Sequence, residues 1–172
     1  MNSIWTFCSG SELRQADILE QCLIASVADS FTENESNPSV HVDNARLIIV
    51  TQSCDLANDK TLYVALCPVF TLDEFELSNS RFKVKGRWEE VRRGKVEGLH
   101  LLAGIADPHN NRDALVVDFR LIVSLPIGYL TRHAEKFSPR PRLLSPYVEH
   151  FSQSFARFFM RVGLPSQIPA FK

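Results

Sequence analysis

Segments rich in Ile, Leu and Val alternate with polar, turn-forming segments along most of the chain, and this pattern predicts strands. Residues 17–25 and 46–53 are the first two such segments, and the Ser-, Asn- and Glu-rich residues 29–39 between them predict an exposed loop. Residues 62–69 form the third segment, directly after the turn-forming residues 57–60. The second and third strands are therefore expected to form a hairpin.

The middle of the chain adds short helices and further strands to this pattern. Pro68 marks an edge or a strand end, because proline cannot donate a ladder hydrogen bond. Thr71 is a candidate N-cap for a helix through Leu77, since acidic residues fill the first turn. A second short helix is predicted around residues 88–93, with Gly94 as its stop. Further strands are predicted at residues 99–105, 114–117 and 120–125.

The C-terminal part holds the clearest helical pattern. Ser145-Pro146 is a start signal with proline at the first helical position, and Gly163 with Pro165 forms a stop signal. Apolar residues between these signals recur at spacings of three and four and form one stripe: Tyr147, Phe151, Phe155, Phe158 and Val162. We expect this stripe to pack on the sheet, with a partner protein as the alternative.

The chain has 172 residues, of which 45% are hydrophobic and 12 are Phe, so it can fill the core of one domain. We expect a single domain over residues 1–172, with a β-rich core at about 15–126 and a helical part at about 127–165. No basic and apolar leader opens the sequence, and no apolar run approaches the roughly 18 residues that span a bilayer. The sequence therefore predicts a cytoplasmic protein without a membrane partner.

Charge is distributed unevenly along the chain although the formal net charge is only −1. Residues 1–79 hold 3 Lys/Arg and 12 Asp/Glu, whereas residues 80–172 hold 16 and 8. The two halves either neutralise each other within the fold or across a homodimer, or they expose a basic face to an anionic partner. The basic residues of such a face would be Arg81, Lys83, Lys85, Arg87, Arg92, Arg93 and Lys95.

The segment Thr51-Gln52-Ser53-Cys54-Asp55 places five polar or reactive side chains directly after an aliphatic strand. Cys54 is a candidate nucleophile, Asp55 a candidate acid, base or orienting carboxylate, and Gln52 a candidate oxyanion or base-reading amide. The structural alternative is that Asp55 begins a turn and that Cys54 is a buried core thiol.

A catalytic cysteine needs a histidine as general base, and the chain offers His41, His100, His109, His133 and His150 without a local signature for any of them. The cysteines Cys8, Cys22, Cys54 and Cys67 form no Cys-x-x-Cys pair, which predicts reduced thiols and argues against a metal site. The scattered glycines form no phosphate loop. We therefore expect neither a metal nor a cofactor.

A second basic motif, Arg140-Pro141-Arg142, precedes the C-terminal helix. Two arginines beside a helix N-terminus form a candidate anion site, since free backbone N–H groups and the helix dipole add to their charge. The alternative is that Arg140 and Arg142 are solvated in a loop stiffened by proline.

Three segments of the N-terminal part carry a resemblance to the MazF/PemK-type toxins: Ala16-Asp17-Ile18-Leu19, Arg46-Leu47-Ile48-Ile49-Val50 and Cys67-Pro68-Val69-Phe70-Thr71. The order of these segments resembles the first three strands of that family, which has a small SH3-like barrel. Ala16 stands where the family has glycine, and no proline follows Arg46. The resemblance implies that Arg46 stabilises the transition state of RNA cleavage and that Thr71 positions the scissile phosphate.

These observations predict an α+β fold, built on a small SH3-like barrel or a bent antiparallel sheet and closed by the C-terminal amphipathic helix. The leading functional hypothesis is binding or processing of RNA or another phosphate-rich ligand; the resemblance adds an origin in bacteria or phages and a toxin-antitoxin or defence role. The first alternative is a non-catalytic interaction or ligand-sensing module with a pocket at Gln52–Asp55. A cysteine hydrolase is the third.

Overall fold

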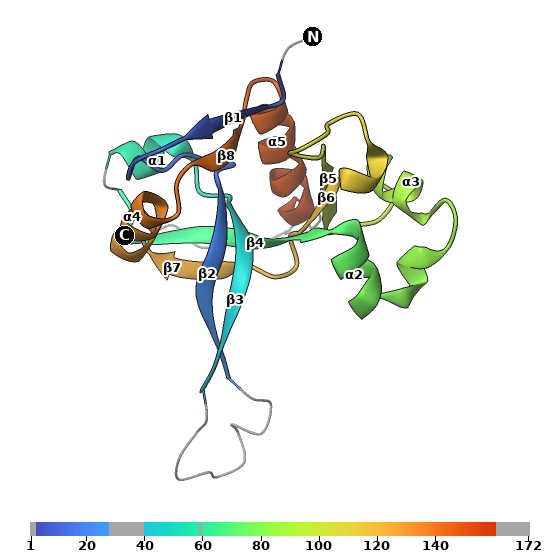
Figure 1. Ribbon diagram of the computed structural model, residues 1–172, viewed down its shortest axis with the longest axis horizontal. Coiled ribbons are helices and arrows are strands. Elements are labelled where there is room, and N and C mark those ends of the chain that lie inside the picture. Colours follow the sequence, from blue (N-terminus) through green and yellow to red (C-terminus); the bar gives the residue numbers. More distant parts are fainter. Residues whose placement is uncertain (1–2, 28–39, 59, 161–172) are drawn as a thin grey trace, which may run out of the picture.

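A computed structural model gives the structure of the protein and describes residues 3–27, 40–58 and 60–160. Its centre is a six-stranded antiparallel sheet in which the strand order is β2-β3-β4-β6-β5, with β7 also paired to β4 (Figure 1). In chain order the strands are β2 (Ile18–Val27), β3 (Val40–Ile49), β4 (Tyr63–Thr71), β5 (Leu99–Leu102), β6 (Leu115–Asp118) and β7 (Val123–Pro126). The prediction that the first three strands share one antiparallel sheet is confirmed.

The described strands do not close into a barrel, because β2 and β5 form the two ends of the ordered path through the sheet. The fold is thus α+β with an antiparallel sheet, as predicted, in an open form. A second, two-stranded sheet pairs β1 (Trp5–Cys8) with β8 (Arg140–Leu143). The sequence pattern predicted neither of these two strands, and β8 interrupts the part expected to be helical.

β4 is the strand on which the main sheet depends, since it pairs with β3, β7 and β6 along different parts of its length. Pro68 lies inside this strand, opposite Leu47 of β3, so the prediction that it marks a strand end is wrong. The strand tolerates the proline because β7 ends its pairing at Leu66 and β6 begins at Val69. Neither strand therefore requires an N–H from Pro68.

The ends of β3 also differ from the prediction. The strand begins at Val40, six residues before the start of the expected strand 46–53, and stops at Ile49, four residues before its expected end; α1 (Ser53–Ala57) follows. The amides of Val50 and Thr51 both donate to the carbonyl oxygen of Ala65, which turns the chain out of the ladder. Asp55 therefore lies in a short helix rather than at the start of a turn.

The other helical elements are α2 (Leu72–Ser78), η2 (Ser80–Lys83), α3 (Arg87–Arg92), η3 (Asn111–Asp113), α4 (Ile127–Lys136) and α5 (Tyr147–Phe159). The predicted cap of α2 is confirmed: the amide of Glu74 donates to Thr71 Oγ1 at 3.1 Å, and the amide of Thr71 donates to Glu74 Oε2 at 2.6 Å. These two bonds form a capping box. α3 ends just before Gly94, whose φ of 68° suits glycine.

The apolar stripe of α5 packs on the sheet, as predicted. Phe151 is fully buried against the core, and Phe155 and Phe158 are partly buried against the same cluster. Phe119 contacts all three rings, with centroid distances between 5.3 and 6.3 Å. Val162, the last member of the predicted stripe, lies outside the described residues. Within the described part of the chain, no helix is long and apolar enough to span a bilayer.

Candidate functional site

A cavity of about 540 Å³ is lined by residues from the end of α3, the strand β5 and the last turns of α5. Figure 1 labels these three elements. We call it the α3–α5 pocket and define it by the side chains of Arg92, Arg93, His100, Phe119, Arg157 and Phe158. Arg92 and Arg93 belong to the basic segment that the sequence singled out, whereas Arg157 comes from a helix 64 residues later. The fold thus brings three arginines and two phenyl rings to one cavity.

The arginines of this pocket are exposed and only partly neutralised. Glu89 accepts hydrogen bonds from Arg92 Nε at 2.6 Å and from Arg93 Nε at 2.7 Å. These bonds lower the pKa of the Glu89 carboxyl to about 2, so it is ionised at neutral pH. Arg157 makes no ion pair with any residue that the structure describes. The lining contains one carboxylate, that of Glu97, beside the three arginines. The lining therefore carries an excess of positive charge.

His100 provides a neutral ring in the same pocket. Its imidazole stacks on Phe119 at a centroid distance of 5.9 Å and an interplanar angle of 20°. Burial, together with the nearby His150, lowers the His100 pKa to about 4. A neutral imidazole has one donor and one acceptor nitrogen, and its flat face can stack on a planar ligand. The pocket can thus offer both cationic and aromatic contacts.

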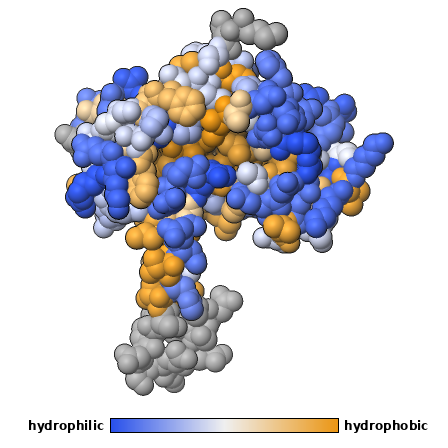
Figure 2. All heavy atoms as spheres, in the orientation of Figure 1, coloured by the Kyte–Doolittle hydropathy of each residue, from blue (hydrophilic) through white to orange (hydrophobic). Residues whose placement is uncertain are grey.

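The rest of the basic segment forms a surface next to this pocket, over α2, η2 and α3, where Figure 2 shows mostly hydrophilic residues. Lys83, Lys85 and Lys95 are exposed, and none of the three makes an ion pair within the described residues. The guanidinium groups of Arg81 and Arg87 each lie 5.4 Å from the centroid of the buried Phe82 ring. These two arginines thus make cation–π contacts with the ring beneath them.

The segment Gln52–Asp55 lies at the start of α1, where two smaller cavities of about 440 and 470 Å³ share Ser53 and Cys54. Cys54 is exposed, and its Sγ is 3.6 Å from Gln52 Oε1 and 3.8 Å from Asp55 Oδ1. No histidine among the described residues makes a hydrogen bond to Cys54. A catalytic cysteine needs a base within hydrogen-bond reach, so this arrangement suits polar binding better than cysteine catalysis.

The remaining cysteines do not complete a reactive or metal-binding cluster. Burial raises the pKa of the Cys22 and Cys67 thiols to about 12. Cys67 is fully buried in the core, whereas Cys54 lies at the surface. Among the described residues, no group of three or more His, Cys, Asp or Glu side chains could hold a metal ion.

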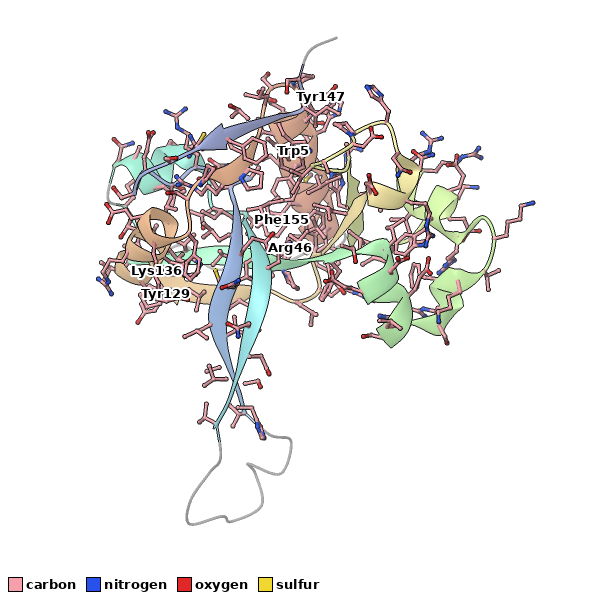
Figure 3. The ribbon with its side chains drawn as sticks, viewed as in Figure 1. Trp5, Arg46, Tyr129, Lys136, Tyr147 and Phe155 are labelled. Carbon is pink, nitrogen blue, oxygen red and sulfur yellow. The ribbon has the colours of Figure 1, made fainter. Side chains whose placement is uncertain are left out.

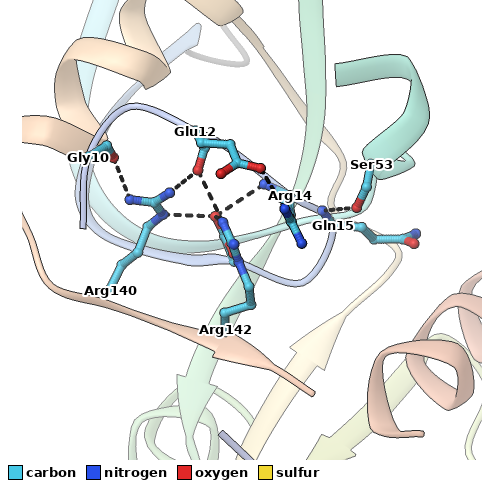
Figure 4. A network of polar contacts seen from close by, with 8 residues as sticks. Gly10, Glu12, Arg14, Gln15, Ser53, Arg140 and Arg142 are labelled. Carbon is cyan, nitrogen blue, oxygen red and sulfur yellow. Dashed lines mark hydrogen bonds and ion pairs between the residues drawn. The ribbon is translucent and has the colours of Figure 1, made fainter. Parts of the chain in front are cut away.

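Arg140 and Arg142, labelled in Figure 4, both form ion pairs with Asp17. Arg140 Nε and Arg142 Nη2 each donate to Asp17 Oδ2 at 2.8 Å, and Arg142 Nε donates to Asp17 Oδ1. Arg140 also donates to the backbone oxygens of Gly10, at 2.7 Å, and of Glu12. Asp17 and Arg140 are almost completely buried, at 0 and 2% exposed. This geometry favours a structural role, because protein acceptors already use the donors of Arg140.

Arg46 and Thr71, which the resemblance implicates, lie on either side of Glu74. Arg46 Nε donates to Glu20 Oε1 at 2.7 Å, and its Nη1 is 3.5 Å from Glu74 Oε2. Figure 3 shows Arg46 on β3, near the level at which β3 crosses β4. The hydroxyl of Thr71 accepts the cap bond from Glu74. Both side chains therefore have partners within the fold.

Sequence reasoning found the basic segment but missed Arg157 and Phe119 as parts of the site. Arg157 lies in α5, and the sequence pattern of this helix indicated only its apolar stripe. Comparison of the chain with protein-family models, curated proteins and solved structures gives no match. The chemistry of the pocket itself therefore carries the functional argument.

Proposed function

We propose that the protein binds single-stranded RNA, with phosphates on the basic surface 81–95 and one nucleotide in the α3–α5 pocket. The observation that carries this proposal is the meeting of Arg92, Arg93 and Arg157 with a neutral His100 and the partly exposed ring of Phe158 in one cavity. Arginines bind phosphate through charge and directed N–H groups, and aromatic rings stack on unpaired bases. A site for a purely inorganic anion would not need the rings.

The near-zero net charge of the chain is compatible with this proposal because the positive charge is local. Arg140, Arg142 and Arg112 of the basic half pair with carboxylates of the acidic half, namely Asp17, Asp73 and Glu76. These pairs neutralise charge within the fold. Lys83, Lys85 and Lys95, which have no ion-pair partner among the described residues, leave positive charge where a phosphate chain can approach it.

RNA binding is tested by fluorescence anisotropy with a labelled 12-nucleotide RNA at 50 to 300 mM salt. We expect the affinity to fall steeply with salt, because bound phosphates release counterions. Arg157→Gln and Arg92→Gln should each weaken binding roughly 5- to 20-fold and flatten the salt slope by about one. Arg132→Gln is the matched control, since Arg132 is an exposed arginine of α4 outside the pocket. Absence of binding at 50 mM salt would reject the proposal.

RNA cleavage and a toxin-antitoxin or defence role belong to the proposal only through the resemblance to MazF/PemK-type toxins. Incubation of the same RNA with the wild type and with Arg46→Gln, followed by gel analysis of the fragments, tests cleavage independently of binding. Products that disappear with Arg46→Gln would support a catalytic role for Arg46. If the RNA stays intact with the wild type, the protein binds RNA without cleaving it.

Ligand sensing at Gln52–Asp55 is a second candidate, favoured by the two cavities that meet at Ser53 and Cys54. The larger of the two is lined mainly by uncharged amides and hydroxyls, including Gln15, Gln52 and Ser152. A thermal-shift screen of neutral polar metabolites, repeated with Gln52→Ala, tests this function. A ligand that stabilises the wild type but not the variant would identify the site.

A further inference from the structure

The distal halves of β2 and β3 form a two-stranded arm that projects from the rest of the molecule (Figure 1). Ala25 lies opposite Val42 and Val27 lies opposite Val40, while Leu23 lies opposite Asn44. Residues opposite each other in an antiparallel pair point to the same face, and this face repeats at every second residue. One face of the arm therefore carries an apolar set that we call the arm stripe: Leu23, Ala25, Val27, Val40 and Val42.

The arm stripe is exposed to an extent unusual for a strand face. Leu23, Val27, Val40 and Val42 are between 51 and 61% exposed. Figure 2 shows hydrophobic residues along the arm. A two-stranded ribbon is only marginally stable in water by itself, and it gains stability when its apolar face is covered. No described residue covers this face.

A largely apolar groove lies where the arm joins the body, with a volume of about 800 Å³. We call it the arm-base groove; Ala25 of the arm, Leu77 of α2 and the pair Leu121 and Ile122 before β7 line it. Leu77, Leu121 and Ile122 are 79, 53 and 44% exposed. A protruding apolar surface and a hollow apolar surface therefore adjoin on the same chain.

Seven of the 13 large hydrophobic residues that are exposed in the described part of the chain lie on these two surfaces. At roughly 100 Å² for a fully exposed Val or Leu side chain, they present on the order of 400 Å² of apolar area. A standard interface buries about 800 Å² on each partner, somewhat more than half of it apolar. The exposed apolar area thus matches what a stable dimer needs.

We propose that the arm stripe of each molecule docks into the arm-base groove of a second copy, which gives a two-fold symmetric dimer. Two-fold symmetry uses the same pair of surfaces twice, so a chain that carries both the arm and the groove is complementary to itself. None of the stripe or groove residues lines the α3–α5 pocket, so the dimer leaves that pocket open to RNA, whereas it covers Arg46, which lines the groove. This proposal therefore stands independently of RNA binding.

Light scattering coupled to size-exclusion chromatography, from about 1 to 100 μM protein, gives the first test. We expect twice the 19.5 kDa mass of one chain. Val42→Asp on the arm and Leu121→Asp in the groove should each raise the dimer dissociation constant at least 100-fold, because a charge would be buried in an apolar contact. Leu62→Asp is the matched control, since Leu62 is 78% exposed and lies outside both surfaces.

A disulfide experiment distinguishes the arm-in-groove arrangement from other dimers. In a background with Cys8→Ser and Cys54→Ser, we mix Val42→Cys with Leu121→Cys and oxidise mildly. A disulfide-linked heterodimer supports the proposal, whereas Val42→Cys mixed with Leu62→Cys should remain uncrosslinked. A monomer at 100 μM, larger oligomers, or efficient crosslinking of Val42→Cys to itself would each overturn it. Circular dichroism of every variant confirms that it is folded.

Discussion

Two arginine-rich segments of this protein resemble each other in sequence but differ in the structure. Arg140 and Arg142 point inward and surround Asp17, whereas Arg92 and Arg93 lie at the surface of the α3–α5 pocket. The exposed side-chain fraction is 2% for Arg140 and 66% for Arg92. The two segments differ in the carboxylate that the fold supplies: Asp17 comes from the residue before the distant strand β2, whereas Glu89 comes from the same short helix as Arg92.

This comparison shows that charge along the sequence predicts a ligand site only when the partners of that charge are known. Asp17 is 123 residues away from Arg140 in the chain, and it meets Arg140 only because β8 lies beside the start of β2. Glu89 is three residues from Arg92 and stays exposed with it. Solvent screens the second kind of pair, so its arginines can exchange Glu89 for another anion.

The largest expected effect is on stability at the inward network. Asp17→Asn leaves two arginines without a buried counter-charge, and we expect the free energy of unfolding to fall by about 3–5 kcal/mol. Urea denaturation followed by circular dichroism measures this change. Asp73→Asn is the control, because the exposed Asp73–Arg112 pair should contribute less than about 1 kcal/mol. Similar losses for both variants would contradict the contrast between inward and outward arginines.

The second prediction concerns pH and the buried ring of the outward pocket. The His100 pKa is about 4 in the folded protein, below the ordinary histidine value of 6.5 that is expected in the unfolded chain. The unfolded chain therefore binds the proton more tightly. His100 thus contributes stability that is present above pH 6.5 and is lost as pH falls from 6.5 to 4, by up to about 3 kcal/mol. Denaturation at pH 4.5 and 7 tests this, with His100→Gln expected to reduce the difference. An unchanged pH profile in this variant would contradict a neutral His100.

The third prediction sharpens the description of the outward arginines. Glu89→Gln removes the charge that holds Arg92 and Arg93, so RNA affinity should rise about 2- to 5-fold. The thermal midpoint should change by no more than about 2 °C, since the pair is exposed. Anisotropy and thermal denaturation measure the two effects. Weaker binding would show that Glu89 orients the arginines rather than competes with the RNA.

The smallest effect on stability is expected in the segment Gln52–Asp55. Asp55 is half-exposed, with its Oδ1 3.9 Å from Lys60 Nζ, and Cys54 is exposed. Cys54→Ser and Asp55→Asn should therefore each change the free energy of unfolding by no more than about 1 kcal/mol. Alkylation of the native protein should modify Cys54 well before Cys22 and Cys67, whose buried thiols keep a pKa of about 12. Mass spectrometry of peptides locates the label. Early labelling of Cys67 would place it nearer the surface than the structure does.

Local patterns predicted the elements that depend on local chemistry. The capping box at Thr71, the stop of α3 at Gly94 and the apolar stripe of α5 all follow from residues within a few positions of one another. The strand β8 was missed because its residues, Arg140 to Leu143, are half polar and owe their burial to contacts with distant residues. The end of β3 was missed for a related reason, since the oxygen that turns the chain belongs to Ala65.

The candidate site, like the fold, was predictable only where it depends on residues close together in the sequence. The basic segment is visible in the sequence because its charges are clustered, and two of its arginines reach the α3–α5 pocket. Arg157 and His100 join them only through the docking of α5 on β5 and β6, which no spacing indicates. The arm stripe has an alternating apolar pattern that is typical of any half-buried strand. Only the structure shows that this face is uncovered.

The position of β4 has a consequence for how the protein opens and exchanges its amide hydrogens. Three strands depend on this one segment, so unfolding of β4 would dissolve the pairing of β3, β6 and β7 together. The amides of Val64, Leu66 and Val69 should therefore exchange with solvent only through global unfolding, while those of the arm exchange through local opening. In folding, β4 cannot complete its pairing until β6 and β7, about 50 residues later, have formed, which favours a slow and highly cooperative transition.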